Sequence, residues 1–596
     1  MTSDTPFDAV IVGAGVAGAL IAKQLTGAGL RVLLLEAGPG TSQSFNGYSR
    51  HLQQFYGATS KSAESPWPPA AAAPQPDSSD LRNNNGYFVQ RGPDLYGSTY
   101  TRTWGGSTLH WLGVSLRMLP EDFRMHSRHG VGRDWPLGYN DLAPFYARAE
   151  HELGVSADVA DQRYHGVSFA EDYDYPMQRV PLSYSDRVLG AAVDGMTVWF
   201  DHESFDLKVR SYPAARNSIP RGAYQPVGAV DLHDDGSSNP PLLGGRCQGN
   251  TSCTPICPVQ AKYNAGKSLA QADRRYLTML VQAVASKILV DPANGGVQGI
   301  EYKRYQDPAS TRFTTAVAKG RVYILTAHAV ENARLMLASG LTGPRGQVGQ
   351  TLMDHPALYA WGLAPLAIGA FRGPQSSAGI EDLRGGAFRA RHAAFRFDIG
   401  NDGWRSTTGA PDSTVSEAVM SQRLFGTALR DQLANLLSRQ VRMSLAIEQL
   451  PDPANAVTVD PQYLDALGNP RPVISYHIDD YTKAGMVAAS GVARALFRRA
   501  GVQDFSESGN GSWFPSVYYQ GREFHYHGMG HFSGTHAMGD DPQQSVIDPD
   551  QRAWQHHNLF LAGSGSFPTM GTSNPTLTLA ALALRTADHL VATLQQ

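Results

Sequence analysis

Four consecutive features at the start of the chain restrict its fold more than any other part of the sequence. Residues 7–12 form a short, largely apolar run, as expected for a strand of a buried parallel sheet. A glycine-rich turn and an apolar-periodic segment through Ala19, Leu20 and Leu25 follow, and residues 31–35 form a second apolar strand. Strand, glycines, helix and strand in this order predict an α/β fold of the Rossmann type that binds a dinucleotide.

The glycines and one acid of this unit have separate expected roles. Gly13 allows the tight turn after the first strand, Gly15 lets backbone amides approach a pyrophosphate, and Gly18 permits close packing of the helix on the strand. Glu36 ends the second strand about 20 residues on, where a carboxylate accepts hydrogen bonds from ribose hydroxyls. A lone glycine fingerprint is weak, but the complete unit predicts a dinucleotide site.

Composition and charge describe a large globular protein. At 596 residues the chain is too long for one simple core, so we expect two or three lobes. A net charge of -3, with Lys and Arg scattered through the chain, gives no electrostatic case for nucleic acid or an anionic membrane surface. We find no apolar run near the ~20 residues that a membrane span needs and expect no direct span.

The N-terminal residues bear on where the protein works. Residues 1–10 contain no basic segment, apolar segment or cleavage site of an export signal and lead directly into the first strand. We therefore expect the cytoplasm, or the periplasmic face of the membrane if a small signal-bearing partner subunit carries the folded protein out.

Two stretches differ in amino-acid composition from the rest of the chain. Residues 58–85 are rich in Pro, Ala and Ser and too poor in periodic apolar residues for a packed element, so they predict a surface excursion. Residues 366–412 are rich in Gly and Arg with little pattern, and they predict a loop region or a lid within a substrate-side lobe. That lobe carries no readable specificity motif.

All three cysteines of the chain lie within residues 246–258. Cys247, Cys253 and Cys257 do not suit a disulfide framework, since an odd number leaves one thiol over and so short a loop closes little chain entropy. Structural zinc needs a fourth ligand, and no other Cys or His is near. Three thiolates followed by Pro258 favour an iron-sulfur cluster, which passes electrons singly; three buried, inert thiols are the alternative.

The chain also carries a series of short motifs that occur together, and in this order, in one enzyme family. They lie at residues 103–111, 134–142, 352–356, 531–539, 558–563 and 571–576. With them the sequence resembles the glucose-methanol-choline oxidoreductases, from Asp8 to about Leu590. The resemblance implies FAD as the dinucleotide, and a Rossmann-type FAD-binding domain with a discontinuous substrate-binding lobe built on a β-sheet.

The resemblance assigns further residues to the flavin. Gly105, Gly106 and Ser107 are implied to contact the isoalloxazine, where a Cβ atom would collide with the ring. His110 occupies the position from which some family members bond covalently to the flavin; an unlinked histidine packing near the ring is the alternative. The implied flavin-binding set is completed by Gly563, Asn574, Pro575 and Thr576.

The same resemblance places the chemistry at His531 and Asn574. In the family this pair faces the N5 edge of the flavin, and the histidine takes the hydroxyl proton as hydride leaves the carbon. A histidine suits this task because its usual pKa, about 6.5, lies near working pH. Asn574 would hold the substrate oxygen through its amide. His536 is interpreted as structural, and the aromatic and His-rich residues 513–519 and 524–527 resemble a sugar-binding wall or core packing.

One departure from the family pattern follows the strand at residues 322–327. The family usually has a glycine near the FAD diphosphate there, whereas this chain continues with His328. The departure leaves the local backbone geometry open, though not the cofactor.

The cysteine segment refines the resemblance. Cys-x5-Cys-x3-Cys-Pro, followed by Ala-Lys-Tyr-Asn at 261–264, looks like the large catalytic subunits of bacterial glucose, fructose and gluconate dehydrogenases. Those subunits carry a three-iron (3Fe-4S) cluster between FAD and a multihaem cytochrome subunit, which implies Cys247, Cys253 and Cys257 as cluster ligands. Gln248 stands where some of them have a second cysteine, which argues against a covalent tether to the cytochrome.

We expect three parts along the chain. Residues 1–355 form the FAD-binding part, 356–524 the substrate-binding lobe, and 525–596 return to the FAD domain with the catalytic pair. The expected enzyme is an FAD-dependent dehydrogenase that oxidises an alcohol group of a sugar or sugar derivative and passes electrons through the cluster to a cytochrome or quinone-linked acceptor. An oxygen-using pyranose or glycoside oxidase is one alternative, and a lyase or non-redox flavoprotein is an alternative of another class.

Overall fold

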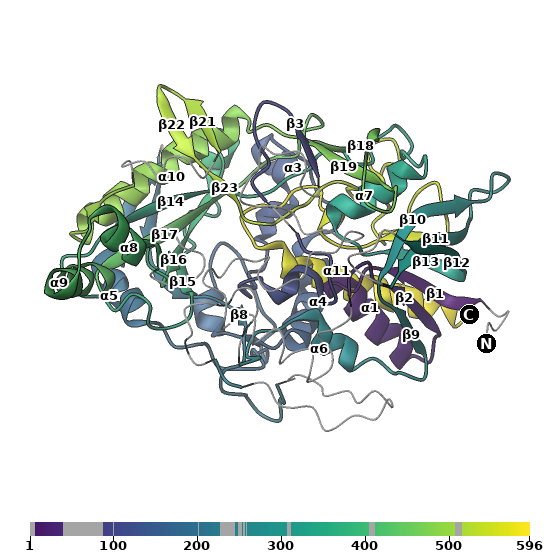
Figure 1. Cartoon of the computed structure of the whole chain (residues 1–596), viewed down its shortest axis with the longest axis horizontal. Helices are drawn as coiled ribbons and strands as arrows, with labels where there is room; N and C mark the ends of the chain where they lie inside the picture. The colour runs from purple at the N-terminus through teal and green to yellow at the C-terminus, as the bar shows by residue number, and fades with distance from the viewer. Residues whose placement is uncertain are drawn as a thin grey trace.

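The computed structural model shows two lobes, each built on a β-sheet (Figure 1). It describes residues 6–39, 88–98, 100–200, 202–226, 245–247, 249, 253, 257, 259–306, 312–404, 412–506 and 515–596. The surface excursion predicted at 58–85 lies outside these residues.

A five-stranded parallel sheet forms the core of one lobe. Its strand order is β24 (Leu559–Leu561), β13 (Gly320–Leu325), β1 (Phe7–Val12), β2 (Val32–Leu35) and β9 (Leu277–Leu280). Every neighbouring pair is parallel. The predicted Rossmann-type unit is confirmed, and its apolar strands are largely buried because both faces of the sheet are covered.

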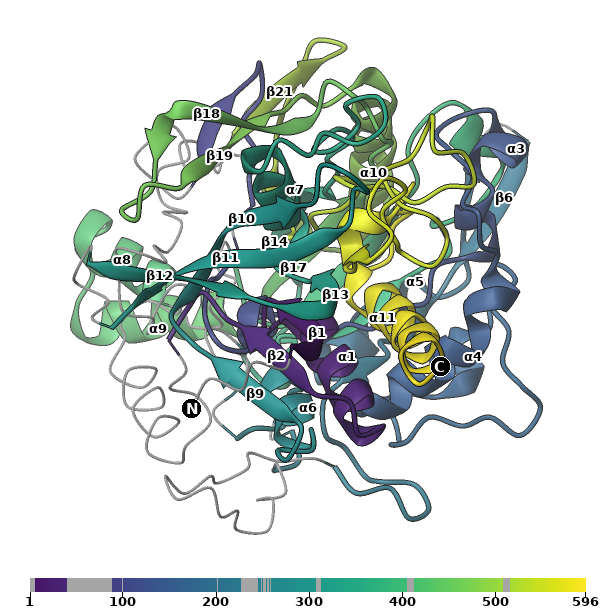
Figure 2. The same cartoon turned by 90° about the vertical axis from the view of Figure 1, so that its right-hand side faces the viewer.

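Three helices pack together on one side of this sheet (Figure 2). They are α1 (Val16–Gly27), α11 (Pro575–Leu594) and α4 (Tyr139–Glu152). By length and composition, α11 is the one helix of the described residues that could cross a membrane, so our expectation that no apolar stretch reaches this length is wrong. Because 67% of its apolar window is buried inside the protein, packing in the core accounts for this composition.

Above the parallel sheet in Figure 2 lie a meander and a second small sheet. The meander consists of β10 (Ala283–Val290), β11 (Val297–Tyr305) and β12 (Phe313–Ala318). Helix α7 (Ala329–Ala338) contacts β10 and the sheet formed by β18 (Ala456–Leu464), β19 (Pro470–Ser475) and β3 (Val89–Arg91).

The other lobe is built on a seven-stranded sheet that is antiparallel throughout. Its order is β20 (Gln503–Asp504), β14 (Pro356–Leu363), β17 (Gln440–Ile447), β16 (Phe395–Gly400), β15 (Ser376–Ile380) and β7 (Val209–Ser211), with β23 (His527–Gly528) paired to β14. Strands β15 and β16 lie within residues 366–412, so our prediction of a loop or lid there is wrong. Non-local pairing with β17 and β7 makes these segments strands.

Strand β17 shows how this sheet serves both the core and a cavity. Its odd-numbered residues 441–447 are Val, Met, Leu and Ile, all buried, on the face that α10 (Asp480–Arg499) covers. Burying each such side chain contributes roughly 1.5–3 kcal/mol. The alternate residues Arg442 and Ser444 line the cavity between the lobes, because successive side chains of a strand point to opposite faces.

The remaining elements are short. The helices are α3 (Met125–His129), α5 (Tyr184–Val193), α6 (Ala265–Ala270), α8 (Asp412–Ser416) and α9 (Gly426–Leu437). The strands are β4 (Val155–Ser156), β5 (Met196–Phe200), β6 (Glu203–Leu207), β8 (Ala214–Ala215), β21 (Ser516–Tyr519) and β22 (Arg522–His525).

Candidate active site

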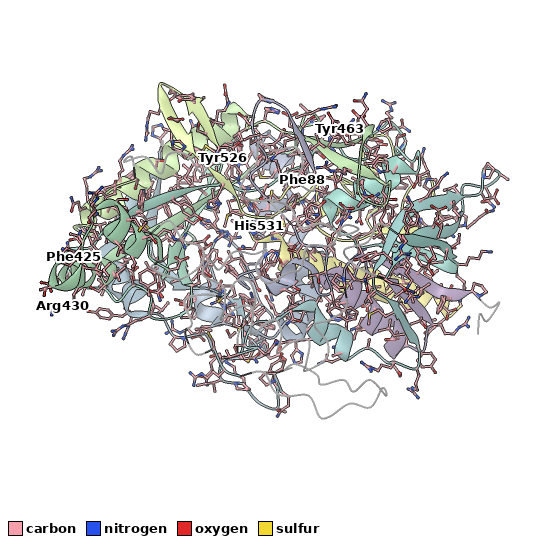
Figure 3. All side chains as sticks on the ribbon, viewed as in Figure 1. Phe88, Phe425, Arg430, Tyr463, Tyr526 and His531 are labelled. Carbon is pink, nitrogen blue, oxygen red and sulfur yellow. The ribbon has the colours of Figure 1, made fainter. Side chains whose placement is uncertain are left out.

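A cavity of about 560 Å³ lies where the two lobes meet. The carboxyl ends of β1 and β2 bound it on one side, and the polar face of β14, β16 and β17 bounds it on the other. The predicted cofactor and catalytic residues that line it are Gly13, Gly15, Glu36, Gly105, Gly106, Ser107, His110, His531, Gly563, Asn574, Pro575 and Thr576. Gly18 is the exception, since it lies inside α1. Figure 3 places His531 between the lobes.

Close backbone contacts shape the turn at the nucleotide end of the cavity. Gly13 has φ +105°, and a Cβ on it would lie 2.7 Å from Cα of Ala327. A Cβ on Gly18 would lie 2.1 Å from the carbonyl oxygen of Gly13, so the turn and helix fit only around a glycine. A Cβ on Gly15 would meet no atom within 4 Å, which leaves this side of the turn open to the cavity. The open helix N-terminus fits a pyrophosphate.

Glu36 is buried at the end of β2 and faces the same end of the cavity. Its Oε2 accepts a hydrogen bond from Ala14 N–H at 2.9 Å, and its Oε1 accepts one from Gly38 N–H at 2.7 Å. Burial raises the pKa of Glu36, while these amides and Arg102 favour the carboxylate. Each carboxylate oxygen has a further lone pair, so Glu36 can also accept the ribose hydroxyls as predicted.

The glycine pair predicted to contact the flavin has a conformation that favours glycine. Gly105 and Gly106 have left-handed φ angles of +83° and +54°. Nearby, Nε2 of His110 lies 2.8 Å from Oγ1 of Thr101. Burial and then the charge of Lys262 lower the pKa of His110 to about 3, so this ring is neutral near pH 7. A covalent bond between His110 and the flavin stays a prediction.

His328, where the sequence lacks the expected glycine, adopts a backbone conformation that glycine would suit. Its φ is +95°, in the region that other residues rarely adopt. Its side chain accepts a hydrogen bond from Val330 N–H at the start of α7 and stacks on Tyr100, with ring centroids 4.2 Å apart. Burial lowers the pKa of His328 to about 4. These contacts hold a neutral ring against the cavity wall.

His531 and Asn574, the predicted catalytic pair, are in direct contact. Nδ2 of Asn574 lies 3.1 Å from Nε2 of His531. Asn574 is the N-cap of α11, where Pro575 starts the helix. The backbone N–H of His531 donates to Oδ1 of Asp354 at 3.0 Å. The pair therefore combines a residue fixed by a helix start with one fixed by a buried carboxyl group.

A second histidine determines which nitrogen of His531 carries the proton. Nε2 of His355 lies 2.9 Å from the carbonyl oxygen of Gly571, so this nitrogen must donate and Nδ1 of the neutral ring must accept. The two Nδ1 atoms of His355 and His531 lie 2.7 Å apart, which requires a proton on Nδ1 of His531. Nε2 of His531 is then the unprotonated nitrogen, and it faces Asn574. These tautomers are assigned from the hydrogen-bond partners.

Burial, helped by nearby positive charge, keeps both histidines neutral. Burial lowers the pKa of His531 well below its usual value, and His355 and Arg396 lower it further. Burial likewise lowers the pKa of His355 to about 3. A neutral His531 with a lone pair on Nε2 is in the state that a general base needs.

Arg396 on β16 fixes the other member of the pair, and the sequence interpretation missed it. Its Nη2 donates to Oδ1 of Asn574 at 3.0 Å, and its Nε donates to the carbonyl oxygen of Thr572 at 2.8 Å. It also pairs with Asp398, which accepts from Tyr212 as well. The alternation Phe-Arg-Phe-Asp-Ile at 395–399 was the available signal, since period-two alternation indicates a strand.

Other predicted contacts are divided between the cavity and the core. His536 is fully buried, with Nε2 3.2 Å from Nδ2 of Asn332, and it does not line the cavity. His527 lines the cavity, with its ring 4.3 Å from that of Tyr359, whereas Phe524 is buried in the core. Residues 513 and 514 lie outside the described residues. Of the described residues of the predicted sugar-binding wall, His527 is the one that lines the cavity.

The cysteine segment is described only in part. Cys253 and Cys257 are buried, Cys247 is partly exposed, and no disulfide joins them. Burial raises the pKa of Cys247, and the other two thiols interact with it electrostatically. Among the described residues, no three Cys, His, Asp or Glu side chains are placed to hold a metal ion. The role of the three cysteines as cluster ligands therefore stays a prediction.

Comparisons with known proteins identify the family. Residues 241–357 and 451–583 match models described as GMC oxidoreductase, and residues 8–118 match a model described as FAD dependent oxidoreductase. Over 604 residues the chain is 30% identical to the fructose dehydrogenase large subunit of Gluconobacter japonicus, covering 99% of this chain and 98% of that protein. The chain belongs to the GMC oxidoreductase family.

Further relatives agree with this assignment. This GMC oxidoreductase is 24% identical to the gluconate 2-dehydrogenase flavoprotein of Pantoea cypripedii, over 98% of this chain and 93% of that protein. Its fold matches the crystal structure of pyridoxine 4-oxidase from Mesorbium loti with a TM-score of 0.58 at 18% identity, over 98% and 99% of the two chains. It is thus an FAD-dependent oxidoreductase acting on CH–OH groups, and the open glycine turn, Glu36 and the glycine pair at 105–106 fit that cofactor.

Proposed function

We propose that this GMC oxidoreductase is a dehydrogenase that oxidises an alcohol group of a sugar or sugar derivative and uses an electron acceptor other than oxygen. The observation that carries the proposal is the contact at 3.1 Å between Nε2 of His531 and Nδ2 of Asn574 on the cavity wall. The full-length relatives named as fructose and gluconate dehydrogenases support the dehydrogenase assignment.

The side chains of the pair divide the work at the substrate hydroxyl. FAD, when bound, accepts the hydride that leaves the substrate carbon. His531 takes the hydroxyl proton at Nε2, and Asn574 donates from Nδ2 to the substrate oxygen. Arg396 occupies Oδ1 of Asn574, so the amide presents its donor to the substrate. The alcohol loses one hydride and one proton and becomes a carbonyl compound.

The wall opposite the pair supports a polyhydroxylated, uncharged substrate. Tyr359 and Asp398 both lie directly opposite Ser444 on neighbouring strands, and all three line the cavity. Arg442 on this wall pairs with Asp402, and Arg396 behind Asn574 pairs with Asp398, so each arginine is matched by a carboxylate. A wall of hydroxyl and carboxylate groups without net positive charge suits the hydroxyl groups of a sugar better than a carboxylate substrate.

We also propose that Cys247, Cys253 and Cys257 hold a 3Fe-4S cluster. The support is a thiol-only donor set beside buried basic side chains, which suits an anionic group. When bound, such a cluster carries single electrons between the flavin and an external acceptor. The acceptor would be a cytochrome or quinone-linked subunit, with a small signal-bearing subunit placing the enzyme at the periplasmic face; a cytoplasmic enzyme is the alternative where no such partner exists.

An anaerobic spectroscopic screen tests the proposal. Purified enzyme is mixed with D-fructose, D-glucose, D-gluconate and simple alcohols, and loss of the oxidised-flavin absorbance is recorded. We expect an uncharged sugar to bleach the flavin and D-gluconate to leave it oxidised. Bleaching by simple alcohols alone would contradict the sugar assignment.

The second candidate is an oxygen-using sugar oxidase, which His110 on the cavity wall favours. The reduced enzyme is mixed with air-saturated buffer or with anaerobic ferricyanide, and the return of the flavin absorbance is timed. A dehydrogenase reoxidises much faster with ferricyanide. Rapid reoxidation by oxygen with stoichiometric hydrogen peroxide would favour the oxidase.

A further inference from the structure

Three buried basic side chains form a group beside the cysteines that the proposed hydride transfer does not use. Arg216, Lys262 and Lys267, here called the cation cluster, are 2%, 2% and 5% exposed. In the part of the chain that the structure describes, none of the three forms an ion pair with a carboxylate. Buried charges are normally paired, because removing an ion from water costs several kcal/mol. A nearby anion would therefore stabilise the positive charge of the cation cluster.

The described groups that can supply negative charge to it are the thiols. Electrostatic interactions connect Lys262 to Cys253 and Cys257, and Lys267 to Cys257. Arg216 in turn interacts with Cys247. Each of the three cysteines thus interacts electrostatically with at least one member of the cation cluster.

The backbone holds the cation cluster and the cysteine segment together. Arg216 and Lys262 are paired across an antiparallel β-bridge. The N–H of Cys247 donates to the carbonyl of Asn217 at 2.9 Å, next to Arg216. Lys262 Nζ donates to the carbonyl oxygen of Cys253 at 2.8 Å. Arg216 and Lys262 therefore belong to the segments that support the cysteines.

Lys262 and Arg216 also hold the loop that lines the cavity next to His110. Lys262 Nζ donates to the carbonyl oxygen of Trp111, and Nε of Arg216 donates to that of Leu112 at 3.0 Å. Trp111 and Leu112 line the cavity directly after His110. Lys262 is thus bonded both to the cavity loop and to the cysteine segment, and Arg216 is bonded to the cavity loop.

We propose that the cation cluster is the counter-charge of the anionic group held by the cysteines and sets its reduction potential. This inference rests on the proposed 3Fe-4S cluster. Ferric ions and sulfides within three thiolates carry a net negative charge, and uptake of one electron adds another. Buried positive charges stabilise the reduced form most, so they raise the reduction potential and favour electron transfer away from the reduced flavin.

The test removes one charge at a time in the complete enzyme. The variants are Lys262→Met and Lys267→Met, with Lys262→Arg as the conservative variant that keeps the charge. Lys303→Met is the matched control, because Lys303 also donates to a carbonyl, that of Leu467, in a different part of the fold. Iron and acid-labile sulfide per flavin are measured first, and the midpoint potential is then measured by an electron paramagnetic resonance titration.

We expect Lys262→Met and Lys267→Met to lower the midpoint potential, while Lys262→Arg and Lys303→Met stay near the wild type. Ferricyanide, a one-electron oxidant, should reoxidise the substrate-reduced flavin severalfold more slowly in the two Met variants. Bleaching of the flavin by substrate should be unchanged in Lys267→Met, because hydride transfer does not involve this side chain.

The outcomes separate this inference from the proposed function. Wild-type enzyme without iron would overturn the proposed cluster and the inference with it. Iron at wild-type content with unchanged potentials in both Met variants would overturn the inference alone. If Lys262→Met lost its iron, Lys267→Met and Lys262→Arg would still decide the question through their potentials.

Discussion

Replacing His355 by phenylalanine tests the assignment of the base more directly than replacing the base. His355→Phe keeps a buried ring of similar size but removes the Nδ1 acceptor that lies 2.7 Å from Nδ1 of His531. A buried donor left without a partner costs about 1–3 kcal/mol. The tautomer of His531 that carries its lone pair on Nε2 loses this stabilisation, and the tautomer that carries a proton there does not.

This penalty sets the expected size of the effect. At about 1.36 kcal/mol for each factor of ten, flavin reduction by substrate should slow roughly 5- to 160-fold. The rate is measured by anaerobic stopped-flow absorbance at saturating substrate. His355→Gln is the control, because its amide oxygen can accept the same proton, and it should recover part of the lost rate.

The pH dependence separates tautomer control from a loss of packing. In the wild type the pKa of His531 lies well below 6.5, so the base stays unprotonated and the rate stays constant down to acidic pH. His355 is itself neutral, since burial lowers its pKa to about 3, so its loss removes no positive charge from beside His531. The rate of His355→Phe should therefore be lower than the wild-type rate by the same factor at neutral and at acidic pH. A packing defect that admits water would instead raise the pKa of His531 and bring an acid limb into the rate profile. An unchanged rate would refute the relay from His355 to His531.

Other side chains around the cavity make separate contributions. His531→Ala should retain FAD but slow flavin bleaching by roughly 10²–10⁴-fold, the usual contribution of a positioned base; an unchanged rate would mean that another group takes the proton. Arg396→Met should raise the KM and lower the melting temperature, since breaking a buried ion pair costs about 3–5 kcal/mol; a wild-type melting curve would speak against the pair with Asp398. Cys253→Ser should lose iron and sulfide yet still be bleached by substrate, and full iron retention would remove this thiol from the ligand set. Acid precipitation should release FAD from the wild-type enzyme. If the yellow flavin instead stayed with the precipitated wild-type protein and was released from His110→Ala, the covalent bond would be established.

The sequence was sufficient for the nucleotide end of the site because its residues act through local geometry. The glycine turn and Glu36 belong to one continuous strand-turn-helix-strand unit, and each role follows from its place in that unit. His531 and Asn574 were recognised as members of short motifs. Their contact could not be derived from the residues, since they come from separate loops that meet only in the folded cavity.

The other half of the site depends on strand pairing, which the sequence pattern hid. Arg396 and Asp398 lie in a stretch interpreted as a loop because its Gly and Arg content masks the alternation of β16. Polar residues on a strand usually indicate a solvated face, but here that face forms the wall of a cavity. His355 was visible within a motif, yet its role depends on the carbonyl of Gly571, over two hundred residues away. Such contacts require the register of the sheet.

The turn at residues 571–574 joins both halves of the acid-base geometry. The carbonyl of Gly571 sets the tautomer of His355 and through it that of His531, while Arg396 holds both the carbonyl of Thr572 and the side chain of Asn574. The turn leads into α11, which packs on the parallel sheet, whereas Arg396 lies on β16 of the antiparallel sheet and His355 directly precedes its strand β14. The proton position on the base and the direction of the amide are therefore set by contacts between the lobes. A substitution that loosens this junction should impair proton abstraction, because both the tautomer of His531 and the orientation of the Asn574 amide depend on it.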